Sequence, residues 1–300
     1  MTQWDGKTRG GVTGHKIFVF FIKYFGVSFA YFFLKLVAVY FLFATSRAYK
    51  SIYFYFHSIH QYGKVKAYYY AYLNFCMLGK ILVDKIALLS GATKKYTFNF
   101  DGEEHLRGLV TNKTGGILVN AHVGNWEIAG QLLERLDTKI HILMFEAEHD
   151  QVNNYMSEVL QEKNIGMIVI GNDLSHLEKI KEALMNKEII AMNGDRYMPG
   201  NRTISCPFMG GEADFPVSPF YMAGKFKVPV VCVFAMKETK YHYHFYATPP
   251  RMLDNFGNLK LREETLKKVV FEYVAGLEKM LRKYPVQWFN YYNFWKQTEK

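Results

Sequence analysis

The order of apolar and polar residues divides the chain into two regions. Residues 1–16 are polar and glycine-rich, and a long apolar run follows from Ile17. Aromatic, helix-like sequence continues to residue 90. Beyond it, apolar stretches of strand length alternate with amphipathic stretches of helix length. The pattern predicts a basic arm with a helical region over residues 1–95 and an α/β domain over residues 96–300.

Alternating strands and helices favour parallel βαβ units, because parallel strands need a crossover that is usually a helix. We therefore predict a mostly parallel central sheet flanked by helices. Strands are expected at 96–100, 115–120, 139–145, 166–171, 188–193, 228–237 and 241–249, and helices at 126–136, 151–164, 173–187, 215–226 and 261–283. The helix at 173–187 has Asn172 or Asp173 as its N-cap. The strand at 241–249 is expected at the sheet edge, and residues 286–296 form an aromatic tail.

The apolar run from Ile17 predicts association with a membrane. About 20 apolar residues cross a bilayer, and the run is longer, but Lys23 and Lys35 interrupt it. A lysine at the bilayer centre costs about 2.5–3.5 kcal/mol. Two arrangements fit, a spanning helix with its lysines near the ends or a helix lying in the interface. A buried helical hairpin is the alternative without a membrane.

A cleaved signal peptide fits poorly, because the apolar run is too long and is broken by charge. The three cysteines are far apart and form no CxxC pair, which suits a reducing compartment. We therefore expect the chain to stay on the cytoplasmic side of the membrane.

The formal net charge of +10 favours an anionic partner, which nucleic acid, an acidic protein and a membrane surface would all satisfy. Tyrosines mixed with lysines over residues 47–90 would suit single-stranded nucleic acid. The same mixture marks a membrane interface. The neighbouring apolar run favours the membrane, so no nucleic-acid partner is expected.

Two polar clusters follow predicted strands, at the sheet edge where ligands bind in open parallel sheets. The first contains Asn120, His122, Asn125 and Glu127, and the second contains Asn193, Asp195, Arg196 and Arg202. If His122 lies in the turn and Glu127 in the first helical turn, Glu127 can hold one ring nitrogen while the other acts as a base. The helix N-terminus would offer amide donors to an oxyanion. The alternative is that His122 caps the helix and Glu127 complements its dipole.

Motifs for nucleotides and metals are missing. The chain has no GxGxxG, no GxxxxGK[ST] and no HExxH. His242 and His244 alternate on one strand face, but no third ligand lies nearby in the sequence. We expect neither a metal nor a nucleotide cofactor.

The segment HVGNWE resembles the H-x4-D/E motif of the glycerolipid acyltransferase superfamily. Its Asn-Trp-Glu variant is similar to the bacterial lipid A biosynthesis (lauroyl/myristoyl) acyltransferases. NGDRYMPGNR, PFMGGEADFPVSPFYMAGKFKVPVVCVF and VQWFNYYNFWK resemble later blocks of that family, in the same order. The apolar N-terminus resembles its membrane anchor, so the resemblance covers nearly the whole chain.

The resemblance implies transfer of a fatty acyl chain from an acyl thioester to a hydroxyl or amine of a lipid or glycolipid. The thioester is a substrate on acyl carrier protein or coenzyme A, so no cofactor is expected. The implied location is the cytoplasmic face of the bacterial inner membrane. His122 would be the base, Glu127 its orienting partner and Asp195 a second acidic residue of the site. Asn125 would contact the substrate.

One departure from the family concerns its functional arginine. No arginine lies between Arg135 and Arg196, and Lys163 is the nearest cation in position. Because lysine lacks the planar fork of arginine, acceptors other than a lipid A precursor stay open, namely amino-acid lipids, mannosides and polyene lipids. Arg196 and Arg202 are expected to bind a phosphate, or else to form surface ion pairs.

Two further classes of function remain. A membrane glycosyltransferase would also place carboxylates at strand ends, although no DxD-like motif is present. A non-catalytic membrane-associated protein would keep the fold without a working histidine.

Overall fold

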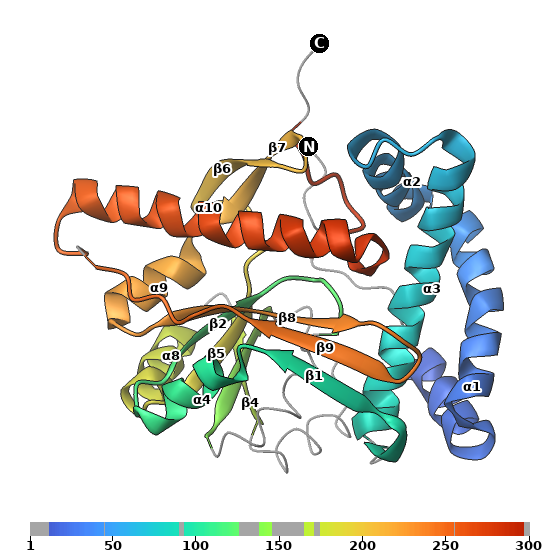
Figure 1. The fold of residues 1–300 in the computed structure, drawn as a ribbon, viewed down its shortest axis with the longest axis horizontal. Coiled ribbons are helices and arrows are strands. Elements are labelled where there is room, and N and C mark those ends of the chain that lie inside the picture. Colours follow the sequence, from blue (N-terminus) through green and yellow to red (C-terminus); the bar gives the residue numbers. More distant parts are fainter. Residues whose placement is uncertain are drawn as a thin grey trace.

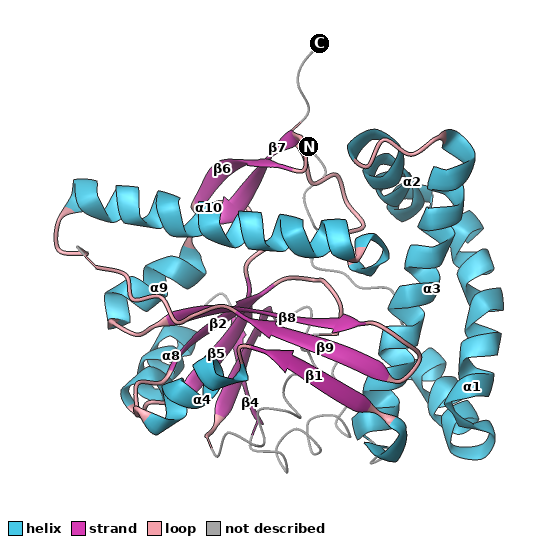
Figure 2. Ribbon diagram, in the orientation of Figure 1, coloured by secondary structure: helices cyan, strands magenta, loops and turns pink. Residues whose placement is uncertain are grey.

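A central sheet organises the computed structural model, which describes residues 12–44, 46–89, 93–125, 138–145, 165–170, 175–254 and 256–296. The sheet strands are β1 Thr97–Asp101, β2 Gly116–Asn120, β3 Ile140–Phe145, β4 Ile165–Ile170, β5 Ile189–Asn193, β8 Val230–Lys237 and β9 His242–Ala247. The helices around it are α4 Glu103–Thr111, α8 Ser175–Met185, α9 Ser218–Phe226 and α10 Leu259–Lys283. Figures 1 and 2 show α10 lying across the sheet.

The strand order is β1-β9-β8-β2-β5-β3-β4. The five strands from β8 to β4 are parallel to one another, β9 is antiparallel to β8, and β1 is parallel to β9. The prediction of a mostly parallel sheet flanked by helices is confirmed. The prediction of an edge strand at 241–249 is wrong, because β1 pairs with β9 from Thr97↔His242 to Asp101↔Tyr246 and extends the sheet beyond it.

Both faces of the sheet are buried, so its central strands read as continuous apolar runs. Successive side chains of a strand point to opposite faces. In β5, Ile190 and Met192 join the core that α10 covers with Val270 and Leu277. Ile189 and Ala191 join the opposite core, to which α4 contributes Leu109.

Helix α10 agrees with the helix predicted at 261–283. Its N-cap is Asn258, whose side chain accepts a hydrogen bond from the Leu261 backbone N. Helix α9 begins at Ser218 and carries proline in its first turn, where the missing N–H costs nothing. The helices predicted at 126–136 and 151–164, and the N-cap at Asn172 or Asp173, lie outside the described residues.

A hairpin of β6 Thr203–Phe208 and β7 Gly211–Pro216 was not apparent from the sequence pattern. Its two-residue turn has positive φ at both Met209 (53°) and Gly210 (87°), as type I′ turns require. The first turn position, where asparagine is usual, is occupied by methionine, which rarely adopts a positive φ. The usual Asn-Gly sequence signal of such a turn is therefore missing. Pro207 and Pro216 further hide the strands, because proline cannot donate to a ladder. Helix α4 was likewise not expected.

The N-terminal helices are α1 Val12–Ala44, α2 Ser46–Phe54 and α3 Lys64–Leu89, with a π-helical turn at Tyr55–Ile59 before α3. The backbone of α1 breaks at Gly26, where φ is 77° and ψ is 168°. Helices α1 and α3 lie side by side at one end of the sheet, next to the β8–β9 turn (Figure 1). Among the helices of the described residues, none combines the length with the apolar character that a bilayer crossing requires.

Candidate active site

His122 and Asp195 meet at the carboxyl edge of the parallel strands. β2 and β5 are neighbours in register, and their last residues, Asn120 and Asn193, are paired. His122 and Asp195 each follow two residues later. The ring Nδ1 of His122 lies 2.7 Å from Asp195 Oδ1, and the His122 backbone N donates to Asp195 Oδ2 at 2.9 Å. One carboxylate therefore joins the two strand-end loops.

The charge on Asp195 sets the tautomer of the histidine ring. The Asp195 side chain is 0% exposed. Burial alone would raise the pKa of Asp195, but the neighbouring His122 and Arg196 outweigh it and hold that pKa below its ordinary value. The ionised carboxylate can only accept hydrogen bonds, so Nδ1 of His122 carries a proton, and in the neutral ring the lone pair is on Nε2.

The Nε2 side of the ring faces Asn193. The Asn193 Nδ2 atom lies 3.4 Å from His122 Nε2. The His122 side chain is 14% exposed, whereas its carboxylate partner is fully covered. A base whose Nδ1 is held by a buried carboxylate, on a ring that keeps some exposure, is suited to take a proton from a ligand.

Gly124 lets the loop after β2 turn close to β8. Its φ is 59°, and a Cβ at this position would lie 2.0 Å from the Ala235 carbonyl oxygen. The Gly124 backbone N donates to Gln287 O, and the Asn125 backbone N donates to Ala235 O. Only glycine combines this backbone conformation with so close an approach.

The C-terminal aromatic segment, residues 286–296, contacts both His122 and Asp195. The Phe289 backbone N donates to the His122 carbonyl oxygen. The indole Nε1 of Trp288 donates to Asp195 Oδ2 at 3.5 Å, and the Tyr292 hydroxyl donates to the Asp195 carbonyl oxygen at 3.4 Å. The sequence signals of this segment are its aromatic density and its resemblance to a later block of the family, and neither indicates contact with the site.

The family of the chain follows from comparison with known proteins. The sequence model of the family described as bacterial lipid A biosynthesis acyltransferase matches residues 14–297. The chain belongs to this family. The resemblance seen in HVGNWE and the later blocks is thereby confirmed, and the protein is an acyltransferase.

A solved structure is also similar to this acyltransferase. It is the crystal structure of the 1-acyl-sn-glycerophosphate (LPA) acyltransferase PlsC from Thermotoga maritima, with 15% sequence identity and a TM-score of 0.40. The match covers 84% of this chain and 97% of that one. No curated protein sequence matches the chain.

The other predicted site residues of the acyltransferase lie in different surroundings. Asn125 is 2% exposed, and its Nδ2 donates to Ile81 O at 3.3 Å and to the Tyr243 hydroxyl at 3.4 Å. Arg196 donates from Nη2 to Phe289 O at 2.9 Å, beside Asp195. Arg202 forms an exposed ion pair with Glu263. Glu127 and Lys163 lie outside the described residues.

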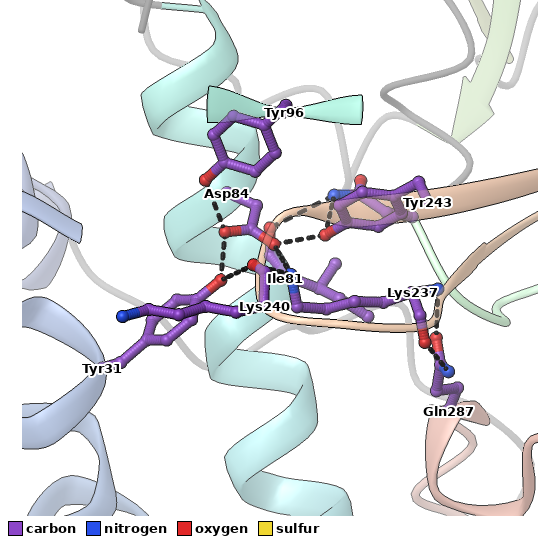
Figure 3. Close-up of polar contacts among 9 residues, drawn as sticks. Tyr31, Ile81, Asp84, Tyr96, Lys237, Lys240, Tyr243 and Gln287 are labelled. Atoms are coloured by element: carbon purple, nitrogen blue, oxygen red, sulfur yellow. Dashed lines mark hydrogen bonds and ion pairs between the residues drawn. The ribbon is translucent and has the colours of Figure 1, made fainter. Parts of the chain in front are cut away.

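A buried polar cluster next to the site has no counterpart in the sequence predictions. Figure 3 shows the Asp84 carboxylate of α3 surrounded by the hydroxyls of three tyrosines and the ammonium of Lys237. Tyr96 donates to Asp84 Oδ1 at 2.7 Å and Lys237 Nζ to Oδ2 at 2.5 Å, while Tyr31 and Tyr243 make further hydrogen bonds to the same group. Burial lowers the pKa of Lys237, and Asp84 opposes this effect.

This Asp84 cluster reaches the loop that carries His122 through two hydrogen-bonded routes. The Tyr243 hydroxyl accepts from Asn125, as described above. The Gln287 side chain bonds both backbone polar groups of Lys237 (Figure 3), while its own carbonyl accepts from Gly124. Hydrogen bonds therefore connect helices α1 and α3 and the site loop to one buried charge pair.

His242 and His244 of β9 interact with carboxylates at the end of β1 and in the β8–β9 turn. His244 lies 3.1 Å from Asp101 and 3.4 Å from Glu238, and His242 lies 3.8 Å from Glu238. Within the part of the chain that the structure describes, no group of three or more histidine, cysteine or acidic side chains is arranged to hold a metal ion.

Proposed function

We propose that this acyltransferase moves a fatty acyl chain from an acyl thioester to a hydroxyl or amine of a lipid or glycolipid acceptor, with His122 as the general base. The observation that carries the proposal is the 2.7 Å contact between His122 Nδ1 and the buried carboxylate of Asp195. It leaves Nε2 as the basic nitrogen, on the side of the ring turned away from Asp195.

The reaction requires one base and no covalent enzyme intermediate. His122 Nε2 takes the proton as the acceptor oxygen or nitrogen attacks the thioester carbonyl carbon. A new C–O or C–N bond forms, and collapse of the tetrahedral oxyanion breaks the C–S bond. The imidazolium then returns its proton to the thiolate. A positioned base of this kind contributes about 10²–10⁴-fold to the rate.

Asp195 stabilises the imidazolium that forms during proton transfer, as the carboxylate of a catalytic triad does. It lies on Nδ1, where an orienting carboxylate is needed. Glu127 as an orienting partner stays a prediction. So do Lys163, Arg196 and Arg202 as ligands of a phosphate on the acceptor or on the carrier arm of the donor.

Acyl carrier protein is the proposed donor, with acyl-coenzyme A as the alternative. The formal net charge of +10 would attract either acidic partner over a distance. The family suggests an acceptor similar to a lipid A precursor. Because no arginine lies between Arg135 and Arg196, an amino-acid lipid, a mannoside or a polyene lipid stays an alternative.

The proposed location is the cytoplasmic face of the bacterial inner membrane. The support is the surface of α1, where Tyr24, Phe32, Leu36 and Tyr40 are each at least 60% exposed. Exposed aromatic and aliphatic side chains on one helix, with the exposed Lys35 among them, suit the headgroup boundary of a bilayer.

The test compares whole-cell lipids by mass spectrometry from cells that carry the wild-type chain or His122→Ala. We expect one acylated lipid to disappear in the variant and its precursor, lighter by one acyl chain, to accumulate. That mass difference gives the chain length, and fragmentation of the precursor gives the acceptor. An unchanged lipid profile with equal protein levels would refute acyl transfer by His122.

A further inference from the structure

Asn193 lies where an acceptor must bind if His122 is the base. It ends β5, and its Nδ2 is 3.4 Å from the His122 Nε2 that would take the proton. At this distance the hydrogen bond is long and weak, so a substrate hydroxyl can replace it. Any acceptor oxygen within hydrogen-bond reach of Nε2 also lies beside the Asn193 amide.

The other end of the same amide has an unused hydrogen-bonding atom. Asn193 Oδ1 is buried and has no hydrogen-bond partner among the described residues. Asn120 Oδ1, on a side chain that is 3% exposed, is in the same condition. Because Asn120 and Asn193 are paired across β2 and β5, their side chains leave the same face of the sheet.

Buried polar atoms without partners are uncommon and call for an explanation. The orientation of the Asn193 amide follows from the histidine, because Nε2 has a lone pair and therefore faces the NH₂ group. The atom left over is an amide oxygen, which only accepts hydrogen bonds. It therefore selects a ligand with an O–H or N–H donor, and it disfavours a phosphate or carboxylate oxygen.

We infer that Asn193, assisted by Asn120, recognises a second hydrogen-bond donor on the acceptor, next to the hydroxyl or amine that is acylated. The acyl chain and the thioester group themselves carry no such donor. Among groups with such a donor, a polyol headgroup, as in a sugar or a glycerol unit, fits two neighbouring amide oxygens, because it carries hydroxyls on adjacent carbons, one to be acylated and others to donate. This inference rests on the proposed function and names a specificity-determining residue for it.

The test uses the purified full chain and three acceptors with the same octyl tail: n-octyl β-D-glucoside, 1-O-octylglycerol and 1-octanol. Myristoyl-coenzyme A and myristoyl-acyl carrier protein serve as donors in parallel, and hydrolysis of the thioester by water is measured alongside. The wild type is expected to prefer at least one polyol acceptor over 1-octanol by about tenfold or more in kcat/KM. The better of the two polyols identifies the headgroup as sugar or glycerol.

Asn193→Ala is expected to lower kcat/KM for the polyol by about tenfold more than it lowers kcat/KM for hydrolysis or for transfer to 1-octanol. Asn120→Ala changes selectivity in the same direction. Asn193→Asp keeps an acceptor oxygen and the shape of the side chain, so it retains the preference for the polyol. The matched control is Asn186→Ala, an exposed asparagine in the turn before the amino end of β5, which leaves every rate unchanged.

His122→Ala distinguishes a failure of the proposed function from a failure of the role inferred for Asn193. If His122→Ala keeps transfer and hydrolysis, the proposed function fails. If it loses both while Asn193→Ala keeps full polyol selectivity, only the present inference fails. Three other results would also overturn the inference about Asn193. They are equal losses of all three reactions in Asn193→Ala, a wild type that acylates 1-octanol as well as the polyols, and a wild type that hydrolyses the thioester without transfer to a polyol.

Discussion

The carboxylate of Asp195 binds His122 at two points, the ring Nδ1 at 2.7 Å and the backbone N at 2.9 Å. The ring contact fixes which nitrogen has the lone pair, and the backbone contact fixes the loop that carries the ring. A single buried residue therefore determines both the chemical state and the position of the proposed base.

Asp195→Asn is expected to lower kcat by about 10²–10⁴-fold with little change in KM. Asparagine has the shape of aspartate but lacks the negative charge that stabilises the imidazolium. Steady-state transfer of a labelled acyl chain measures the effect. Asp254→Asn, at an exposed position, serves as the control with wild-type rates. A loss smaller than about tenfold would show that Asp195 does not support the base.

The same residue predicts how stability depends on pH. The folded-state pKa of Asp195 lies below its ordinary value of 3.8. The ionised Asp195 therefore contributes fully to the unfolding free energy above the unfolded-state pKa. This contribution is lost as the pH falls through the lower, folded-state pKa. Urea unfolding between about pH 7 and pH 3 should show a steeper loss of unfolding free energy in the wild type than in Asp195→Asn. Parallel curves would mean that Asp195 titrates alike in both states.

The strand ends could be predicted from the sequence, but the pairing across them could not. Apolar runs placed β2 and β5 correctly, and the rule for parallel sheets placed His122 and Asp195 at one edge. Spacing along the chain, however, draws attention to near neighbours such as Glu127. The contact between His122 and Asp195 spans 73 positions and depends on β2 lying beside β5, which one sequence does not reveal.

The buried position of Asp84 could not be predicted from the sequence either. It lies in an aromatic helix where a carboxylate is expected to face solvent, because an isolated charge is rarely buried. Its partners come from α1, the residue before β1, and strands β8 and β9. No local pattern brings four such elements together, so the cluster is visible only in three dimensions.

Gly124→Ala is expected to destabilise the protein by about 2–4 kcal/mol. The substitution adds a Cβ 2.0 Å from the Ala235 carbonyl oxygen, at a φ of 59°. Gly200→Ala separates the two causes, because Gly200 also has a positive φ (87°) but nothing within 4 Å of an added Cβ. That control should cost about 1 kcal/mol in urea unfolding. Equal costs at both positions would mean that the close approach to β8 is not rigid.

Asp84→Ala is expected to cost about 3–5 kcal/mol of unfolding free energy, because it leaves the Lys237 ammonium buried without its carboxylate. Lys237→Met costs less, since three tyrosine hydroxyls still donate to Asp84. The double variant should be more stable than the sum of the single losses predicts, by about 1–3 kcal/mol.

Lys240→Met, an exposed lysine in the same turn that donates to Ser28, is the matched control and should change stability by no more than about 0.5 kcal/mol. Urea unfolding of the four variants and the wild type measures the coupling. Additive losses would mean that Asp84 and Lys237 stabilise the fold independently, and that the buried pair does not bind the N-terminal helices to the site loop as one unit.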